Sequence, residues 1–148
     1  MEGRKTSYEA KLNVLVIDGQ GGMLGKQLVE AIRKTIPDAE ITVVGTNSTA
    51  TANMLRAGAD NGATGENSVL VTARHADIIV GPIGIVIADS LLGEITPAMS
   101  TAIGRSEAKK VLIPMNKCNN IIVGVGSIST SQMIAEAIQT IRAIAGIA

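Results

Sequence analysis

The sequence of 148 residues contains almost no aromatic side chains: one tyrosine, Tyr8, and neither phenylalanine nor tryptophan. It therefore lacks the rings on which proteins usually stack the bases of single-stranded nucleic acids. Its 13 basic and 13 acidic side chains cancel, and it contains no basic run. Nucleic acid and anionic membrane surfaces are consequently not expected as partners.

Cysteine and histidine are equally scarce, with a single Cys118 and a single His75. One cysteine cannot form an internal disulfide, and one residue of each kind cannot complete a structural zinc site, so no metal is expected. The longest apolar run, Ile78 to Ala88, is about half as long as the ~20 residues of a membrane-spanning helix. Residues 1–11 form a polar N-terminal extension without the apolar stretch of a secretory signal, and we expect a cytoplasmic protein.

From residue 12 onward, short apolar segments alternate with helical patterns, as in a single α/β domain over residues 12–148. Continuous apolar runs rich in β-branched residues are typical of parallel strands that are buried on both faces. Strands are predicted at Leu12–Ile17, Ile41–Val44, Asp77–Val80, Lys110–Met115 and Ile121–Val125. Helices are predicted at about Met23–Thr35, Thr49–Ala57, Glu66–His75, Gly84–Leu92, Pro97–Arg105 and 129–145. This order predicts a doubly wound, mostly parallel, Rossmann-like sheet of about five strands with helices on both faces.

Some of these elements leave alternatives open. The segment Ser68–Thr72, within the third predicted helix, would also pass as a strand. The gap between the last two predicted strands is too short for a parallel crossover, so either they form an antiparallel hairpin or one of them is not a full strand. The last helix is apolar on most of its faces, which favours packing on another subunit and hence a homodimer.

A glycine-rich turn between the first strand and the first helix is the strongest local motif. Its glycines at positions 19, 21 and 25 read GxGxxxG, one residue longer than the dinucleotide-binding fingerprint. Glycine lets backbone amides approach a ligand closely, and a helix N-terminus adds unpaired donors and partial positive charge. The motif predicts a phosphate or nucleotide site, the alternative being a tight turn that binds nothing. The residues assigned to this site are Asp18, Gly19, Gln20, Gly21, Gly22, Gly25 and Lys26.

The pair Gly25-Lys26 is similar to the end of a P-loop, but the rest of that motif is missing. Gln20 stands where the P-loop has its first glycine, and Gln27 stands where it has the hydroxyl that binds Mg²⁺. ATP hydrolysis of the P-loop type is therefore not expected.

Turns after the other strands supply further candidates. Thr46, Asn47 and Ser48 follow the second strand, where NAD-binding folds carry an acid for the ribose. Their hydroxyl and amide groups are suited to a ribose, or they simply cap the next helix. The missing acid weakens the case for NAD and leaves NADP, another nucleotide or a smaller phosphate ester. Because ligands bind outside the carboxyl ends of the strands, we expect the turns after the third and fourth strands to border the same crevice, through Gly81, Pro82, Gly84 and Asn116.

These candidates predict a protein that binds a nucleotide or dinucleotide, NAD(P) or another nucleotide, in a sensing or regulatory role. Two alternatives remain. The first is an enzyme that acts on a small phosphorylated or carboxylated substrate through Asp18, Asn116 or Cys118. The second is a structural or assembly protein. No acid–base pair or nucleophile–base spacing stands out in the sequence.

Four long segments resemble a family of small bacterial proteins that is catalogued only as a domain of unknown function. They are VIDGQGGMLGKQL, VVGTNSTATANMLRAGADNGATGEN, ADIIVGPIGIVIADSLLGEITPAM and KKVLIPMNKCNNIIVGV. Together they span about residues 12–126. The resemblance implies a Rossmann-like fold and no particular activity, so it assigns no catalytic residue.

Overall fold

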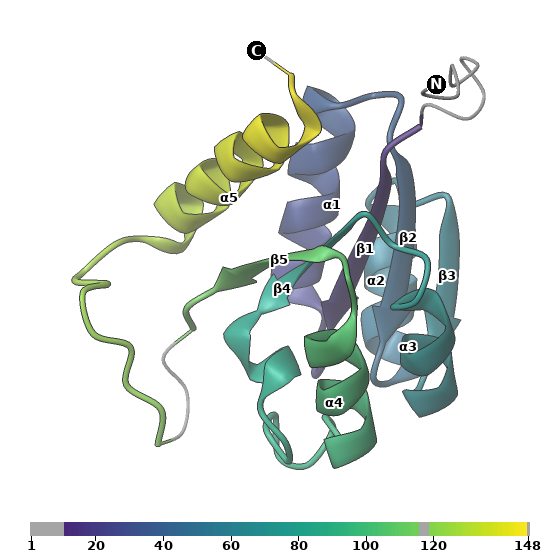
Figure 1. Cartoon of the computed structure of the whole chain (residues 1–148), viewed down its shortest axis with the longest axis vertical. Coiled ribbons are helices and arrows are strands. Elements are labelled where there is room, and N and C mark those ends of the chain that lie inside the picture. Colours follow the sequence, from purple (N-terminus) through teal and green to yellow (C-terminus); the bar gives the residue numbers. More distant parts are fainter. Residues whose placement is uncertain (1–10, 116–118, 148) are drawn as a thin grey trace.

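Five strands in the order β3-β2-β1-β4-β5 form the central sheet of the computed structural model (Figure 1), which describes residues 11–115 and 119–147. All neighbouring strands are parallel. The strands are β1 (Asn13–Asp18), β2 (Glu40–Gly45), β3 (Asn61–Thr64), β4 (Ile78–Pro82) and β5 (Lys109–Ile113). The helices are α1 (Met23–Thr35), α2 (Ser48–Arg56), α3 (Glu66–Thr72), the 3-10 turn η1 (Ile83–Val86), α4 (Pro97–Arg105) and α5 (Thr130–Ala145). The predicted Rossmann-like α/β fold is confirmed.

Strand β1 lies at the centre of the sheet because it is apolar on both of its faces. Successive side chains of a strand point to opposite faces, so Val14 and Val16 enter one core and Leu15 and Ile17 enter the other. The first core is completed by residues of α1, α2 and α5, and the second by residues of α3, η1 and α4. Figure 1 shows α5 lying beside α1. The helices therefore cover both faces of the sheet.

The strand order reverses between β1 and β4. The chain builds β1, β2 and β3 toward one edge, then crosses the sheet through α3 and adds β4 and β5 on the other side of β1. In open parallel sheets, the carboxyl ends of the two strands at such a reversal border a shared crevice. The ends of β1 and β4 are therefore where a site is expected.

The strand prediction is wrong at the edges of the sheet. Ile121–Val125 does not pair with another strand in the described part of the chain, and Gly124 interrupts it with a φ of 91°. The alternative that one of the last two predicted strands is not a full strand is thus the correct one. The fifth strand is instead β3, whose sequence NGAT has no apolar run and which pairs with β2 through its backbone.

The helix predicted at Gly84–Leu92 is also wrong. Only the short turn η1 forms there, and Asp89, Leu91 and Leu92 have φ values of 65°, 56° and 57°. These left-handed conformations cannot continue a right-handed helix. The ambiguous Ser68–Thr72 is helical, but α3 ends at Thr72 and not at the predicted His75. None of the helices in the described ranges combines the length and the apolar character that crossing a bilayer requires.

Arg33, in the last turn of α1, joins the loops at the amino end of the sheet. Its guanidinium donates to the carbonyl oxygens of Pro37, Ala39 and Gly58 at 2.9–3.0 Å and to Asp60 Oδ2 at 2.7 Å. Burial raises the pKa of Asp60, but hydrogen bonds from the Ile41 amide and from Arg33, together with the charges of Arg33 and Lys11, bring the pKa below its usual value. The Asp60 carboxylate therefore adds stability that is lost as the pH falls through this lowered pKa.

Replacing Arg33 with alanine is expected to lower the free energy of unfolding by about 1–3 kcal/mol, because several backbone carbonyls and Asp60 lose their donor. The matched control is Arg74→Ala, an exposed arginine that forms no ion pair within the described residues, which should change stability by less than about 0.5 kcal/mol. Urea unfolding at a series of pH values measures the free energy of unfolding of both variants and of the wild type. The difference between wild type and Arg33→Ala should shrink as Asp60 becomes protonated. If wild type and Arg33→Ala have equal free energies of unfolding at pH 7, this role of Arg33 is contradicted.

Candidate functional site

A cleft of about 320 Å³ lies at the carboxyl ends of β1 and β4. The glycine-rich turn after β1 and the first turns of α1 form one wall, and the ends of β4 and β5, the segment after η1 and the start of α5 form the others. The lining residues are Asp18, Gly19, Gln20, Gly21, Gly22, Met23, Leu24, Gln27, Pro82, Leu91, Met115 and Thr130. The cleft thus occupies the position where open parallel sheets bind ligands, and its volume is that of a small-molecule site.

Asp18 holds the glycine-rich turn in place. Its side chain is buried, with an exposed fraction of 6%. Oδ1 accepts a hydrogen bond from the Gly19 amide at 2.8 Å, and Oδ2 accepts one from the Gly25 amide at 2.7 Å. The Gly25 amide is one of the first-turn donors of α1, which have no partner within the helix. The last residue of β1 therefore caps α1, and the amides of Gly19 and Gly25 are not available to a ligand.

The turn itself needs glycine at specific places. The Gly22 amide donates to the Gly19 carbonyl at 2.9 Å, and Gly22 has a left-handed φ of 71°. A Cβ atom at Gly22 would lie 2.7 Å from Ala50 Cα, so α2 packs directly against the turn. A Cβ atom at Gly25 would meet Met54 Sδ and would lie 2.9 Å from Asp18 Cβ. Both glycines thus serve the packing of β1, α1 and α2.

Three backbone amides on the cleft side of the turn keep their hydrogen-bonding capacity. Within the described residues, the amides of Gly21, Met23 and Leu24 have no protein acceptor, and all three residues line the cleft. Thr130, the first residue of α5, lines the same cleft. Neither α1 nor α5 has an acidic residue in its first turn. Two helix N-termini with partial positive charge therefore border one cleft, an arrangement that favours an anion.

Among the described residues that line this cleft, Asp18 is the only one with an ionisable side chain. Its negative charge offsets part of the attraction for an anion, although its oxygens accept hydrogen bonds from the protein backbone. The described residues contain no group of three or more His, Cys, Asp or Glu side chains that is suited to hold a metal ion.

The opposite side of the glycine-rich turn, toward the end of β2, is filled by protein groups. Glu94 reaches it from the segment after η1: Oε1 accepts from the Gln20 amide at 2.6 Å, and Oε2 accepts from Asn47 Nδ2 at 2.9 Å. Asn47 also caps α2, because its Oδ1 accepts from the Ala50 amide at 2.9 Å. The buried Thr46 Oγ1 has no hydrogen-bond partner there among the described residues.

The predicted site residues thus divide into two groups. Those that line the cleft are Asp18, Gly19, Gln20, Gly21, Gly22 and Pro82. Those that lie outside its lining are Gly25, Lys26, Thr46, Asn47, Ser48, Gly81 and Gly84. Lys26 Nζ lies 4.0 Å from Glu30 Oε1 along α1, and the Gly84 carbonyl accepts from the Ser90 hydroxyl. Asn116 and Cys118 lie outside the described residues.

The sequence motifs did not predict several of the residues that line the cleft. Gln27 is four residues after Met23 and therefore lies on the same face of α1, so helical spacing would have found it. Leu91, Met115 and Thr130 come from distant elements, and no local pattern connects them with the turn.

The fold and the cleft define a Rossmann-like α/β domain with a glycine-rich turn at the reversal of its strand order. Residues 13–146 match the family described as Domain of unknown function (DUF3842), and the chain belongs to this family. No curated protein matches the sequence. Among solved structures, the chain is similar to a dodecameric FMN-dependent UbiX-like decarboxylase from Escherichia coli O157:H7, with 19% identity, a TM-score of 0.45, and coverage of 92% of this chain and 76% of that chain.

Replacing Gly25 with alanine is expected to destabilise the protein by about 1–3 kcal/mol, because the new methyl group would collide with Met54 and Asp18. The matched control is Gly21→Ala, whose Cβ atom would lie 3.7 Å from Met23 Cγ, an ordinary contact. The control should change the free energy of unfolding by less than about 1 kcal/mol. Urea unfolding of the two variants tests this difference, and equal stabilities would contradict the packing of the turn described above.

Proposed function

We propose that the protein binds a nucleotide or a related phosphate ester in the cleft at the ends of β1 and β4. The observation that carries this proposal is the convergence of unpaired amides and two helix N-termini on one cleft. The phosphate oxygens accept hydrogen bonds from the amides of Gly21, Met23 and Leu24. Backbone amides at a helix N-terminus suit this task because they supply donors and partial positive charge without a mobile side chain.

The rest of the ligand lies against the remaining walls of the cleft. Leu91, Pro82 and Met115 offer apolar contact to a base or another ring, and Gln27 and Thr130 offer polar groups. Residues 11–115 and 119–147 contain no phenylalanine, tyrosine or tryptophan, so a base there packs on aliphatic side chains and not on an aromatic ring. Recognition in this proposal depends on the phosphate more than on the base.

The composition of the cleft favours binding over catalysis. General acid–base catalysis needs a positioned proton donor or acceptor beside the reacting group. Within residues 11–115 and 119–147, Asp18 is the only ionisable side chain of the lining, and it already accepts hydrogen bonds from two backbone amides. We therefore propose a sensing or regulatory role in the cytoplasm, in which the bound nucleotide changes the stability or the association of the protein.

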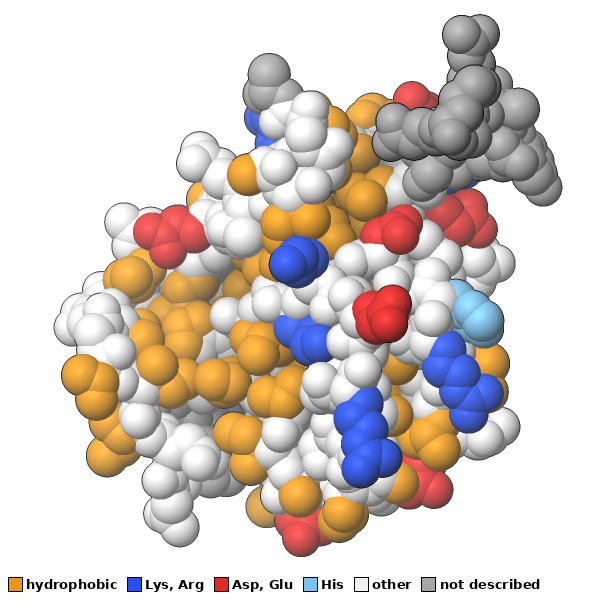
Figure 2. Space-filling view, in the orientation of Figure 1, with side chains coloured by type: hydrophobic (Ala, Val, Ile, Leu, Met, Phe, Trp, Pro, Cys, Tyr) orange, Lys and Arg blue, Asp and Glu red, His pale blue; other side chains and the backbone are white. Residues whose placement is uncertain are grey.

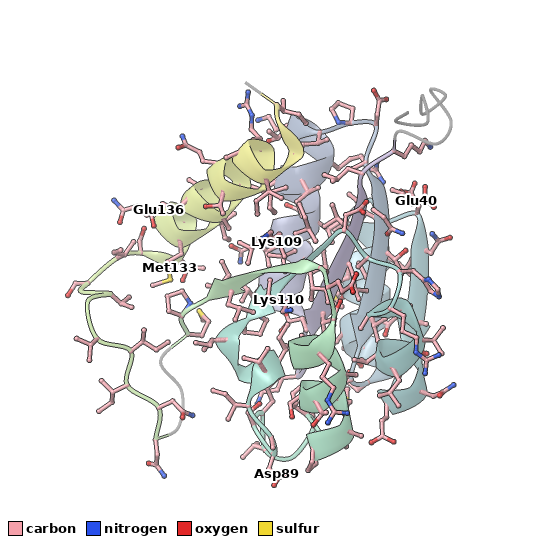
Figure 3. The ribbon with its side chains drawn as sticks, in the orientation of Figure 1. Glu40, Asp89, Lys109, Lys110, Met133 and Glu136 are labelled. Atoms are coloured by element: carbon pink, nitrogen blue, oxygen red, sulfur yellow. The ribbon has the colours of Figure 1, made fainter. Side chains whose placement is uncertain are left out.

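We further propose that two copies associate through the segment 119–128 and the adjoining β5. Ile121 and Val123 are exposed to 85% and 93%, and Figure 2 shows hydrophobic side chains gathered on this part of the surface. An apolar hollow lies between the segment, β5 and the side of α5 that carries Met133 and Glu136 (Figure 3). A projecting apolar segment beside an apolar hollow and an edge strand suits symmetric pairing of two copies.

Ligand binding is tested by thermal unfolding and isothermal titration calorimetry with inorganic phosphate, AMP, NMN and FMN, and with adenosine and riboflavin as controls without phosphate. At least one phosphorylated compound should stabilise the protein, by about 2.7 kcal/mol at a concentration of 100 times its Kd, and the two controls should not. A Cβ atom at Gly21 would make an ordinary contact, 3.7 Å from Met23 Cγ, so Gly21→Val should keep the fold but lose binding. Failure of every phosphorylated compound to bind the wild type would contradict the proposal.

Association is tested by sedimentation equilibrium at micromolar concentration. The wild type should be a dimer, and the double variant Ile121→Asp/Val123→Asp should be a monomer, because charged side chains disfavour burial at an interface. Leu92→Asp is the matched control, since Leu92 is 92% exposed on a different segment, and this variant should remain dimeric. A monomeric wild type would overturn the proposed association, and a monomeric Leu92→Asp protein would place the interface elsewhere.

A further inference from the structure

We infer that the cleft accepts mononucleotides and discriminates against dinucleotides, because the protein itself occupies the place of the second nucleotide. This inference rests on the proposed function and goes further by naming the class of ligand. A dinucleotide on a Rossmann-like sheet spans the crevice, with its pyrophosphate at the first helix and one ribose near the end of the second strand. It therefore needs open space on both sides of the turn that follows the first strand.

Among the described residues, the cleft borders the side of the turn toward β4, and protein groups fill the side toward β2. On the side toward β2, the carboxylate of Glu94 accepts hydrogen bonds from the Gln20 backbone amide at 2.6 Å and from the Asn47 side-chain amide at 2.9 Å. These are the donors that a second ribose or phosphate would meet first at the end of β2. These two donors are thus already paired within the protein, whereas the buried Thr46 Oγ1 has no partner among the described residues.

Packing around Gly19 shows how little space remains on that side. A single Cβ atom at Gly19 would lie 2.7 Å from Thr46 Oγ1, 2.8 Å from Glu94 Oε1 and 2.9 Å from Leu91 Cδ1. Thr46 follows β2, and Glu94 and Leu91 belong to the segment after η1, so two parts of the chain pack against Gly19. A methyl group does not fit here without displacement of a neighbour, and a ribose is much larger.

The segment that carries Glu94 is held by its own hydrogen bonds. The Asp89 amide donates to the Ile95 carbonyl at 2.7 Å, the Ile95 amide donates to the Ser90 carbonyl at 3.2 Å, and Ile95 is fully buried. Figure 3 shows Asp89 at the outer end of this segment. Opening the β2 side would require breaking the hydrogen bonds of Glu94 with Gln20 and Asn47. The free energy of this displacement weakens the binding of every ligand that extends there.

Charge acts in the same direction as packing. Glu94 brings a carboxylate to the end of β2 from a position 47 residues after Asn47. It thereby supplies the acid that the sequence lacks directly after this strand, but its oxygens are engaged by protein donors. The negative charge also disfavours a second phosphate on this side, so a 2′-phosphorylated dinucleotide is the least favoured ligand of all.

The test is calorimetric titration of the full chain with matched pairs: NMN against NAD, AMP against NAD, and FMN against FAD, with NADP added to measure the effect of the 2′-phosphate. For each pair in which binding is detected, the mononucleotide should bind at least about tenfold more tightly, because the dinucleotide must displace Glu94 and its surroundings. Equal or tighter binding of the dinucleotide overturns this inference and leaves the proposed function standing. If no compound in any pair binds, the proposed function is wrong and this inference falls with it.

Two variants at the same position separate packing from charge. Glu94→Ala removes the group that fills the β2 side and should reduce the preference for the mononucleotide by about threefold or more. Glu94→Gln keeps the size of the side chain and should retain most of the preference. Unfolding temperatures of both variants confirm that they are folded. If Glu94→Ala is folded and its preference is unchanged, Glu94 does not select the ligand and the inference is wrong.

Discussion

The candidate site depends on the hydrogen bonds that a buried carboxylate, Asp18, accepts from the amides of Gly19 and Gly25. Hydrogen bonds to a charged group contribute about 1.5–3 kcal/mol each, and these two connect the end of the central strand to the start of the first helix. They determine which amides of the turn the protein uses itself. The amides of Gly21, Met23 and Leu24, which line the cleft, have no protein acceptor among the described residues.

The glycine-rich turn consequently has two unlike sides. The side toward β2 packs against α2 and against Glu94, and the Gln20 amide and the Asn47 side-chain amide on this side donate to the Glu94 carboxylate. The side toward β4 borders the cleft and faces the start of α5. The asymmetry arises from the segment after η1, where left-handed residues Asp89, Leu91 and Leu92 redirect the chain. This asymmetry is the basis for our proposal that the cleft accepts one nucleotide and not a dinucleotide.

The central part of the fold could be predicted because its signals are local. Buried parallel strands such as β1 and β4 are continuous apolar runs, and helix α5 begins with a capping box at Ser129 and Gln132. The edges could not be predicted in this way. Ile121–Val125 has the composition of a strand but pairs with no strand among the described residues, whereas β3 pairs through its backbone and has no apolar run.

In the candidate site, too, the features with local sequence signals could be predicted and those that depend on distant contacts could not. The glycine-rich turn could be located from its spacing and its place between a strand and a helix. The contact of Glu94 with Gln20 joins residues 74 positions apart, and the walls formed by Met115 and Thr130 depend on how β5 and α5 return to the sheet. Tertiary packing decides such contacts, so the side of the turn that is open could not be inferred from the motif.

The most direct measurement is a titration of isotope-labelled protein with inorganic phosphate, the group that the candidate ligands share, followed by amide NMR spectroscopy. The account predicts that the largest shift changes occur at the amides of Gly21, Met23 and Leu24 and at the start of α5. The amides of Gly19, Gln20 and Gly25, which donate to protein carboxylates, should change much less. Shift changes confined to other surfaces, or no change at any amide of the turn, would contradict the account.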